Sequence, residues 1–322
     1  MSKSCYIGID TSNYTTSLAS CDSEGKIIAN LKQLLPVKDG ECGLRQSDAV
    51  FAHIKNISTV SEKLKLDSSD FSPLAIGCSD KPRNVEDSYM PCFLAGVAAA
   101  NFAATVKGVP LYCFSHQEGH VMAALYSAGL TERFDGRKFG AFHVSGGTSE
   151  LLLIDYNSKR KDDDILKIEL VGQSDDLNAG QAVDRVGVMM GFDFPCGAMM
   201  EKCVFEHEGI LDIPRANISV KGLKCNLSGL QNKAEKLYSQ NSDRAVVSAF
   251  VFDFIGRTLM KMTENFRAEY GDLPVLYAGG VMSNKYIKKQ LSVMENVYFA
   301  EPQFSADNAA GIAYLTYLTA NK

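Results

Sequence analysis

Two segments of this chain repeat the same order of short strands and turns. The first, "CYIGIDTSNYTTSLASCDSEGKIIANL", reads as strand, small polar turn, strand, polar turn and strand. The second, "KFGAFHVSGGTSELLLIDYNSKRKDDDILKIEL", follows the same order. The tight turns at residues 10–16 and 145–149 join alternating or aliphatic runs, which is a hairpin signal. Such a repeat favours a fold built from two similar halves.

Each repeat is followed by stretches with apolar residues at three- and four-residue spacing. This spacing predicts helices at residues 47–65 and 90–106 in the first half, and at 180–190 and 242–270 in the second. A later segment, "LPVLYAGGVMSNKYIKKQL", reads as a buried strand, a Gly-Gly turn and a helix. That arrangement presents backbone N–H groups to an anion.

We therefore predict a duplicated α/β protein of two lobes with an interlobe cleft. This architecture is similar to the actin, hexokinase and Hsp70 (ASKHA) class, in which each lobe has a phosphate-gripping hairpin. The expected first lobe comprises residues 1–130 with a C-terminal helix at about 304–322, and the second comprises 131–303. The alternative is that two glycine-containing hairpins occur by chance in a mixed protein, since 322 residues leave room for either arrangement.

Composition excludes some classes of function. The formal charge of −5 argues against autonomous non-specific nucleic-acid binding, although a basic patch or a basic partner could still bring a nucleic acid in. There is no apolar run of the roughly 18 residues that a membrane span needs, and the N-terminus has no signal-peptide pattern. The nine cysteines include no C-x-x-C pair. We expect reduced, mostly buried thiols in a cytoplasmic protein without a membrane segment.

The stretch "FSHQEGHVMAALY" contains two of the five histidines. Residues i and i+4 share one face of a helix, so His116 and His120 can converge on one ion. Neutral imidazole suits zinc or iron. Two ligands do not make a site, however, and the pair can equally be two polar residues on an ordinary helix. Glu118 points away from that face, and the zincin order His-Glu-x-x-His is absent.

Read in order, several segments resemble the TsaD family, once described as O-sialoglycoprotein endopeptidases or glycoproteases. The matching segments are "YIGIDTS", "SHQEGHVMAAL", "VSGGTSELLLI", "AGQAVDRVGVMMGFDFPCG", "VKGLKCNLSG", "YAGGVMSNKYIKKQL" and "SADNAAGIAYL". The resemblance implies that His116, His120 and Asp307 bind a single iron or zinc ion. Asp307 also precedes a predicted helix, so a capping role remains open.

The resemblance also implies an adenine nucleotide or adenylate as ligand. Glycines in the second hairpin would let backbone amides approach its phosphate. The alternative is that Asp184 is a helix-surface acid and that Gly197 and Asn284 are turn residues. The positions that the resemblance assigns to this ligand are Val144, Ser145, Gly146, Gly147, Thr148, Asp184, Gly197 and Asn284.

The implied reaction is transfer of a threonylcarbamoyl group from its adenylate to N6 of the adenosine beside a tRNA anticodon, with partner proteins of the TsaB and TsaE type. The metal would act as a Lewis acid or template, and Asp10 would orient the acceptor. One alternative is a carbamoyl or acyl transferase with another acceptor. A second is a non-catalytic nucleotide-binding subunit. The old protease description has no nucleophile–base pair to support it.

The chain departs from the family pattern around the group to be transferred. Tyr14 and Thr15 replace two consecutive acids, and Thr148 replaces a histidine. The expected Gly-Pro-Gly turn is "SDKPRNVEDSYMP", where Lys81 and Arg83 either bind an anionic group or are solvated loop charges. "PGG" has become "PCG". These differences predict a divergent paralogue that does not replace the housekeeping enzyme.

Overall fold

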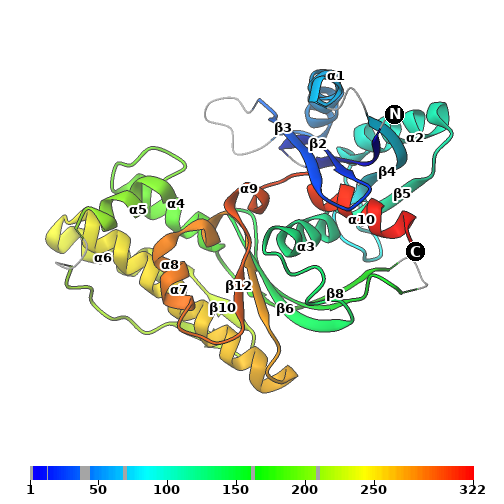
Figure 1. Ribbon diagram of the computed structural model, residues 1–322. Helices are drawn as coiled ribbons and strands as arrows, with labels where there is room; N and C mark the ends of the chain where they lie inside the picture. Colours follow the sequence, from blue (N-terminus) through cyan, green and yellow to red (C-terminus); the bar gives the residue numbers. More distant parts are fainter. Residues whose placement is uncertain (1–2, 13, 37–43, 68–70, 161–163, 208–210) are drawn as a thin grey trace. The chain divides into compact units, whose positions relative to one another are not determined.

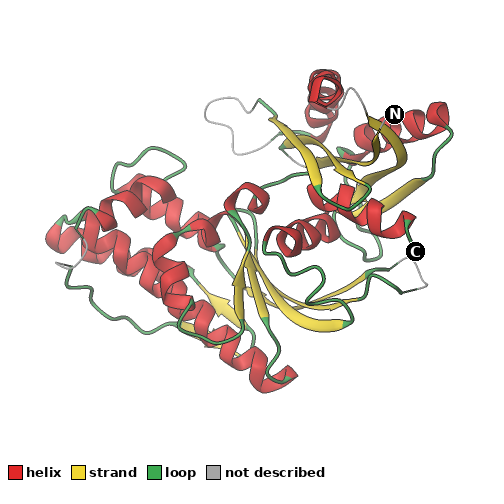
Figure 2. Ribbon diagram, in the orientation of Figure 1, coloured by secondary structure: helices red, strands yellow, loops and turns green. Residues whose placement is uncertain are grey.

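The computed structural model describes residues 3–12, 14–36, 44–67, 71–160, 164–207 and 211–322. The chain divides into two compact units (Figure 1). Unit 1 consists of Met1–Arg137, Tyr156–Ile168 and Ala306–Lys322, and unit 2 of Lys138–Asp155 and Glu169–Ser305. Each unit contains a sheet with helices packed against it (Figure 2). The α/β class predicted from the sequence is confirmed.

Unit 1 is built on a five-stranded sheet in the order β3-β2-β1-β4-β5. Its first three strands are antiparallel, whereas β4 and β5 run parallel to β1. Helices α1 and α2 pack on this sheet, as do α3 and α10, which also pack on each other. The elements are β1 (Lys3–Ser12), β2 (Thr15–Asp22), β3 (Ile27–Leu34), α1 (Gln46–Asp67), β4 (Phe71–Lys81), α2 (Phe93–Lys107), β5 (Leu111–Ser115), α3 (His116–Ser127) and α10 (Ala310–Ala320).

Unit 2 is built on a seven-stranded sheet in the order β12-β11-β6-β7-β8-β10-β9. The long helix α7 is its central support, with fifteen buried residues that include Phe250 and Phe254. The elements are β6 (Arg137–Val144), β7 (Ser149–Tyr156), β8 (Leu166–Ser174), α4 (Ala179–Met189), α5 (Gly197–Phe205), β9 (Ser219–Lys221), β10 (Lys224–Asn226), α6 (Ser228–Asn241), α7 (Arg244–Tyr270), β11 (Val275–Ala278), η1 (Gly280–Ser283), α8 (Lys285–Leu291), β12 (Val297–Phe299) and α9 (Pro302–Ser305).

The two sheets share a topology. In unit 1, β1 lies between the hairpin partner β2 and the later strand β4, with β3 and β5 outside them. In unit 2, β6 lies between β7 and the later strand β11, with β8 and β12 outside them, and β10 and β9 extend the β8 edge. The repeated order of strands in the sequence therefore corresponds to a repeated sheet, as predicted.

The four predicted helices are present as α1, α2, α4 and α7, and each end lies within three residues of the prediction. The largest difference is at α2, which begins at Phe93 and not at residue 90. The first hairpin differs more. Strand β1 continues to Ser12 and β2 begins at Thr15, so Asp10 lies inside the strand pair and not in the predicted turn. Part of the predicted tip at 157–164 lies outside the described residues.

Helix α10 is apolar on all sides because it is buried against both β1 and α3. Glycines permit the close approach. A Cβ atom on Gly8 would lie 2.6 Å from the carbonyl oxygen of Ala309, and one on Gly311 would lie 2.8 Å from the backbone nitrogen of Ala123 and collide with the carbonyl of Gly119. Helices α3 and α10 therefore meet backbone to backbone, which brings the residues before α10 beside α3.

Within the part of the chain that the structure describes, we find no helix with the length and apolar character needed to cross a bilayer.

Candidate metal centre and nucleotide pocket

Helix α3 begins at His116, directly after the edge strand β5. Ser115 caps it: its hydroxyl accepts the Glu118 N–H at 3.2 Å, and the Glu118 carboxylate accepts the Ser115 N–H at 2.7 Å. This reciprocal pair is a capping box. Glu118 is buried on the cap side, so the predicted exclusion of Glu118 from the histidine face agrees with the structure. The sequence signal for this cap is Ser-x-x-Glu at residues 115–118.

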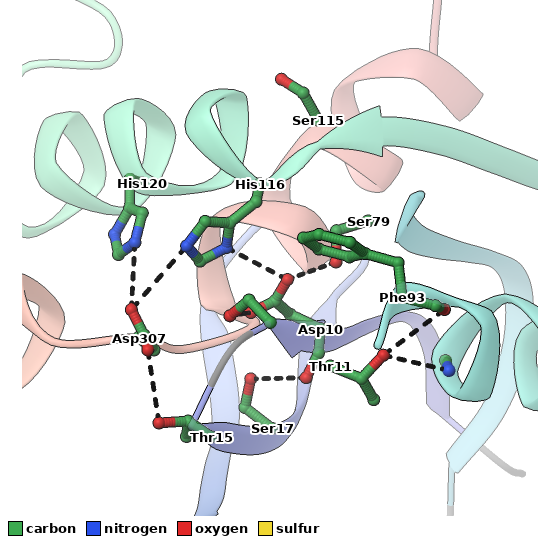
Figure 3. A network of polar contacts seen from close by, with 12 residues as sticks. Asp10, Thr11, Thr15, Ser17, Ser79, Phe93, Ser115, His116, His120 and Asp307 are labelled. Carbon is green, nitrogen blue, oxygen red and sulfur yellow. Dashed lines mark hydrogen bonds and ion pairs between the residues drawn. The ribbon is translucent and has the colours of Figure 1, made fainter. Parts of the chain in front are cut away.

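His116, His120 and Asp307 form one cluster, all within unit 1 (Figure 3). The Nε2 atom of His120 lies 3.2 Å from Oδ1 of Asp307, and Nε2 of His116 lies 3.8 Å from the same oxygen. The two imidazole ring centroids are 4.2 Å apart. One potential ligand atom from each of the three residues lies within 4.8 Å of the others. Chain segments almost two hundred residues apart thus present three donors to one point.

The third member reaches the cluster through the packing of α10 on α3. Asp307 lies three residues before α10, and its side chain is 30% exposed. The side chain that meets the first turn of α10 is that of Asn308, whose Oδ1 accepts the Ala310 N–H at 3.0 Å. The N-cap position of α10 is Ala309, which has no side-chain capping bond, and the Asp307 carboxylate faces the histidines.

Asp10 lies behind His116. Its side chain is 1% exposed, and one carboxylate oxygen is 3.2 Å from Nδ1 of His116. The hydroxyl of Ser12 donates to the carboxylate at 2.7 Å, and that of Ser79 also donates to it. A carboxylate on the far nitrogen of a metal-binding imidazole fixes the orientation of the ring. This position favours support of His116 over the predicted contact with an acceptor.

The charges in the cluster reinforce one another. Burial alone would lower the pKa of His116, but the charge and hydrogen bond of Asp10 and the charge of Asp307 raise it to about 9. Burial alone would raise the pKa of Asp10, but His116, Ser79 and Ser12 hold it below its usual range. A metal ion bound to the Nε2 atom of His116 would displace the proton that this environment favours.

The cluster fits a divalent metal of the iron or zinc type. Donor atoms about 2.0–2.2 Å from one such ion lie roughly 3.0–3.5 Å from each other, and the two nitrogen–oxygen distances here are 3.2 and 3.8 Å. Two histidines and a carboxylate form a set that both metals accept, with coordination positions left for other ligands. Hydrogen bonding of His116 Nδ1 to Asp10 leaves Nε2 as the atom directed toward Asp307.

The first hairpin contributes a neutral side chain to the same place. The hydroxyl of Thr15 donates to the second Asp307 oxygen at 3.4 Å (Figure 3). Tyr14 is half-buried, and its backbone carbonyl accepts the Leu35 N–H at 2.8 Å. Because Thr15 stands where the family pattern has an acid, the structure puts a hydroxyl where a second negative charge is otherwise expected beside Asp307.

Unit 2 has a pocket of about 350 Å³ whose walls include several glycines. Such a volume is in the range of small-molecule sites. The hairpin turn between β6 and β7 forms one side, and the Gly-Gly turn after β11 forms another. Four of the predicted ligand residues line the pocket: Gly146, Asp184, Gly197 and Asn284.

Two further glycines hold these turns together. A Cβ atom on Gly180 would lie 2.6 Å from the Gly146 nitrogen, and one on Gly279 would lie 2.7 Å from the carbonyl carbon of Val144. Gly279 also has a φ of +101°, which L side chains rarely adopt. By contrast, a Cβ atom on Gly146 would have no neighbour within 4 Å. Side chains are therefore excluded at Gly180 and Gly279 by the fold, but not at Gly146.

The other three predicted ligand residues that line the pocket, Asp184, Gly197 and Asn284, also have structural roles. Asp184, on α4, accepts the Cys196 N–H at 2.9 Å. Burial raises the pKa of Asp184, and this hydrogen bond opposes the effect in part. Asn284 caps α8 by accepting the Ile287 N–H at 3.0 Å. Gly197 is the first residue of α5. Asn284 is thus a helix N-cap that also lines the pocket, and its contact with a ligand stays a prediction.

Four predicted ligand positions lie at the end of β6 or in the β6–β7 connection without lining the pocket. Val144 is buried, and the hydroxyls of Ser145 and Thr148 bond to each other at 2.8 Å. The carbonyl of Gly147 accepts the Asn178 side-chain amide at 2.8 Å. Direct ligand contact by these four stays a prediction. The sequence reasoning missed Gly180 and Glu201 as pocket residues, whereas Gly280 belongs to the Gly-Gly turn that it connected with an anion.

Comparison with known proteins gives the family. The sequence model of TsaD, described as tRNA N6-adenosine threonylcarbamoyltransferase, matches residues 89–314, well over half of the chain. This chain therefore belongs to the TsaD family, as the sequence motifs indicated. The matched part contains His116, His120, Asp307 and the pocket, but it begins after the first hairpin, which carries Tyr14 and Thr15.

Solved structures share the fold at low sequence identity. T. kodakarensis HypF has a TM-score of 0.61 and 11% identity over 98% of this chain and 47% of that one. Full-length HypF in a phosphate- and nucleotide-bound form has 0.58 and 13% over 97% and 46%. Component A of Acidaminococcus fermentans (R)-2-hydroxyglutaryl-CoA dehydratase has 0.54 and 13% over 99% of each chain. Our chain spans just under half the length of either HypF structure. These similarities confirm the predicted actin and hexokinase type of fold.

Proposed function

We propose that this protein is a metal-dependent transferase that moves a carbamoyl-type acyl group from an adenylate to an acceptor. One iron or zinc ion is bound by His116, His120 and Asp307. The adenylate is bound in the glycine-lined pocket of unit 2. The observation that carries the proposal is the convergence of three metal-ligating side chains in a member of the TsaD family.

When bound by these three residues, an iron or zinc ion would supply Lewis-acid polarisation of the oxygen atoms of the acyl group. The chain's own residues orient its ligands. Asp10 accepts a hydrogen bond from His116 and holds the ring so that Nε2 is directed toward Asp307. Ser12 and Ser79 in turn hold Asp10. A buried carboxylate with two hydroxyl donors and an imidazole partner has little freedom to move, so the ligand geometry is set before a substrate binds.

The nucleotide proposal rests on the composition of the pocket wall. Gly146 and Gly280 leave backbone groups accessible at two turns, which suits a phosphate. A similar fold in HypF is described in a phosphate- and nucleotide-bound form, which supports the same class of ligand here. An adenylate joins a nucleotide to an activated acyl group, so one substrate would occupy this pocket and supply the group for transfer.

For the acceptor we propose first the N6 atom of a tRNA adenosine, because the family carries that description. TsaB- and TsaE-type proteins and tRNA would then be its partners. One observation favours a different acceptor. Thr15, a neutral residue, lies 3.4 Å from Asp307 in the hairpin where the family pattern has acids. A hydroxyl cannot serve as a carboxylate base near pH 7.

Reconstitution tests both acceptors. Purified protein is mixed with threonine, bicarbonate, ATP, tRNA and the family's partner proteins, and nucleosides are analysed by mass spectrometry. A modified adenosine formed at the rate of an authentic family member supports tRNA as the acceptor and contradicts divergence. Consumption of the adenylate without modified adenosine supports transfer to another acceptor. If the metal-loaded protein neither binds nor consumes an adenylate, the transferase proposal is wrong and a non-catalytic role replaces it.

A further inference from the structure

Two cysteines face each other across neighbouring strands of unit 1. Strands β4 and β5 run parallel, and in their register Cys78 is opposite Cys113. Their sulfur atoms are 3.8 Å apart, close enough for a thiol hydrogen bond. Neither residue belongs to the candidate metal cluster or to the pocket of unit 2.

The two thiols differ in accessibility. Cys78 is fully buried in the core between the sheet and α2, together with Ile76 and Ala100. Cys113 is exposed on β5, an edge strand of its sheet. Of the eight cysteines in the described residues, six are buried and Cys203 is half-buried, so Cys113 is the exposed thiol of this set. An exposed thiol in van der Waals contact with a buried one is an arrangement for reaction followed by resolution.

We propose that Cys113 and Cys78 form a peroxide-reactive dithiol that closes to an intramolecular disulfide. The backbone permits it, because adjacent strands lie about 4.7–4.9 Å apart and disulfides span Cα distances of roughly 4.4–6.8 Å. Closure needs the sulfur atoms to approach from 3.8 Å to about 2.05 Å, which side-chain rotation can supply.

The oxidant is a hydroperoxide. The Cys113 thiolate attacks one peroxide oxygen, a sulfur–oxygen bond forms, the oxygen–oxygen bond breaks, and the leaving alkoxide or hydroxide takes a proton. Cys113 is then a sulfenic acid. The Cys78 sulfur loses its proton and attacks the Cys113 sulfur, and the departing hydroxide takes a proton and leaves as water. Two thiols are oxidised to one disulfide while the peroxide is reduced to an alcohol, or to water, together with the second water.

The electrostatics agree with this division of roles. The hydrogen bond with Cys78 lowers the pKa of Cys113 to about 7; burial and Asp80 oppose the effect, and Lys81 assists it. The same hydrogen bond, followed by burial, raises the pKa of Cys78. Burial also raises the pKa of Cys203, so that partly exposed thiol is the less reactive of the two accessible ones.

The experiment uses the full chain, reduced, zinc-loaded and freed of reductant. The protein is exposed to hydrogen peroxide near pH 7, alkylated, digested without reduction and analysed by mass spectrometry. We expect a cross-linked pair of peptides containing Cys78 and Cys113. This pair is absent from C113S, whose exposed position should tolerate the change, and unchanged in the matched control C203S.

Two variants of the buried partner separate its roles. In C78S and in C78A the sulfenic acid on Cys113 has no resolving thiol, so dimedone should trap it. Serine keeps a hydroxyl donor beside Cys113 and alanine does not. Without the hydroxyl, a smaller fraction of Cys113 is thiolate, although the more basic thiolate is also more nucleophilic. From these two opposing effects we expect trapping to be roughly fivefold slower in C78A than in C78S. Melting curves establish that both variants are folded; if either is not, the comparison of wild type with C113S still decides.

Several outcomes would overturn the proposal. One is the absence of the cross-link at peroxide concentrations that already oxidise Cys203. Another is a disulfide from Cys113 to Cys42, which lies outside the described residues. A third is equal oxidation of Cys113 and Cys203 in the wild type. That result would mean that the contact with Cys78 gives Cys113 no special reactivity.

Discussion

The two units of this protein present their candidate ligand sites by opposite means. In unit 1, side chains that can ligate a metal converge: His116, His120 and Asp307 meet, and Asp10 contacts His116. In unit 2, side chains are missing where the pocket needs room, at Gly146 and Gly280 among others. A site of the first kind is lost when a side chain is removed, and one of the second kind when a side chain is added. Substitutions of opposite sense should therefore separate the two functions.

The largest effect should come from removing a metal ligand. Replacing His120 with alanine takes away one of three donors, so metal affinity should fall by more than about 100-fold, beyond the loss typical of an outer-shell partner. Nucleotide binding by unit 2 should be unchanged. Elemental analysis after dialysis measures the first and calorimetry with AMP the second. H207A, an exposed histidine of unit 2, is the control. Equal metal content in H120A and H207A would mean that the metal is not bound at the cluster of unit 1.

The second effect tests whether Asp10 supports the metal from behind. D10N keeps the size of the side chain but removes the charge that faces His116. We expect metal affinity to fall about 10–100-fold, as for other carboxylates that hydrogen-bond a metal-binding histidine. S79A, which removes one hydroxyl from Asp10, should lower affinity less. Competition with a chromophoric chelator gives both values. Full metal affinity in D10N together with lost transfer would return Asp10 to the acceptor-orienting role.

The third effect fills the pocket of unit 2. A valine at Gly146 has room in the protein, because a Cβ atom there has no neighbour within 4 Å, but it occupies space beside the ligand. AMP or ATP affinity should fall at least about tenfold, which is 1.4 kcal/mol, with metal content and melting temperature unchanged. G180A is the informative contrast. Its Cβ atom would collide with the hairpin turn, so it should destabilise the fold by about 1–3 kcal/mol. Normal nucleotide binding in G146V would place the ligand elsewhere.

The smallest effect concerns a carboxylate of unit 2 that hydrogen-bonds to two separate segments of the chain. Asp176 accepts hydrogen bonds from the Ser228 hydroxyl at 2.5 Å and from the backbone N–H groups of Leu177 and Leu227 at 2.6 and 2.7 Å. Burial alone would raise the pKa of Asp176, but these bonds together lower it to about 2. Because the folded pKa is below the unfolded value of about 3.9, the stabilisation is full above pH 5 and disappears as the pH falls toward 2.

D176N should therefore be less stable than wild type at pH 7, by less than about 1 kcal/mol because the residue is exposed. The difference should shrink as the pH falls from 5 to 2. Denaturant titrations at several pH values measure it, with D175N as the neighbouring control. A difference that stays constant down to pH 2 would mean that the carboxylate charge contributes nothing.

Features that depend on local spacing were easier to predict from the sequence than tertiary contacts. The spacing of His116 and His120 predicted a shared helix face, and a duplicated strand order predicted a duplicated sheet, because both follow from local periodicity. The third ligand did not follow from spacing. Asp307 is brought to α3 by the contact of Gly311 with the backbone of α3, which only the folded chain displays. Its assignment came from the family motifs alone.

The support behind the site was not predicted, for the same reason. Ser79 is on β4 and reaches Asp10 on β1 through a parallel pairing that no local pattern announces. The pocket of unit 2 was predicted in part: Gly146 and Asn284 stood out as turn residues, whereas Gly180 did not. Its glycine is needed because the hairpin turn passes within contact distance, a tertiary constraint with no signal in the sequence around it. The same limit applies to Cys78 and Cys113, which register alone brings together.

The most direct test of the central claim is to locate the metal. Crystals of the protein grown after loading with iron or zinc should give an anomalous difference peak measured at the corresponding absorption edge. We predict a single ion about 2.0–2.2 Å from the Nε2 atoms of His116 and His120 and from an Asp307 oxygen. A loaded protein whose ion lies away from these three residues, or metal-replete crystals with no peak beside them, would contradict the account.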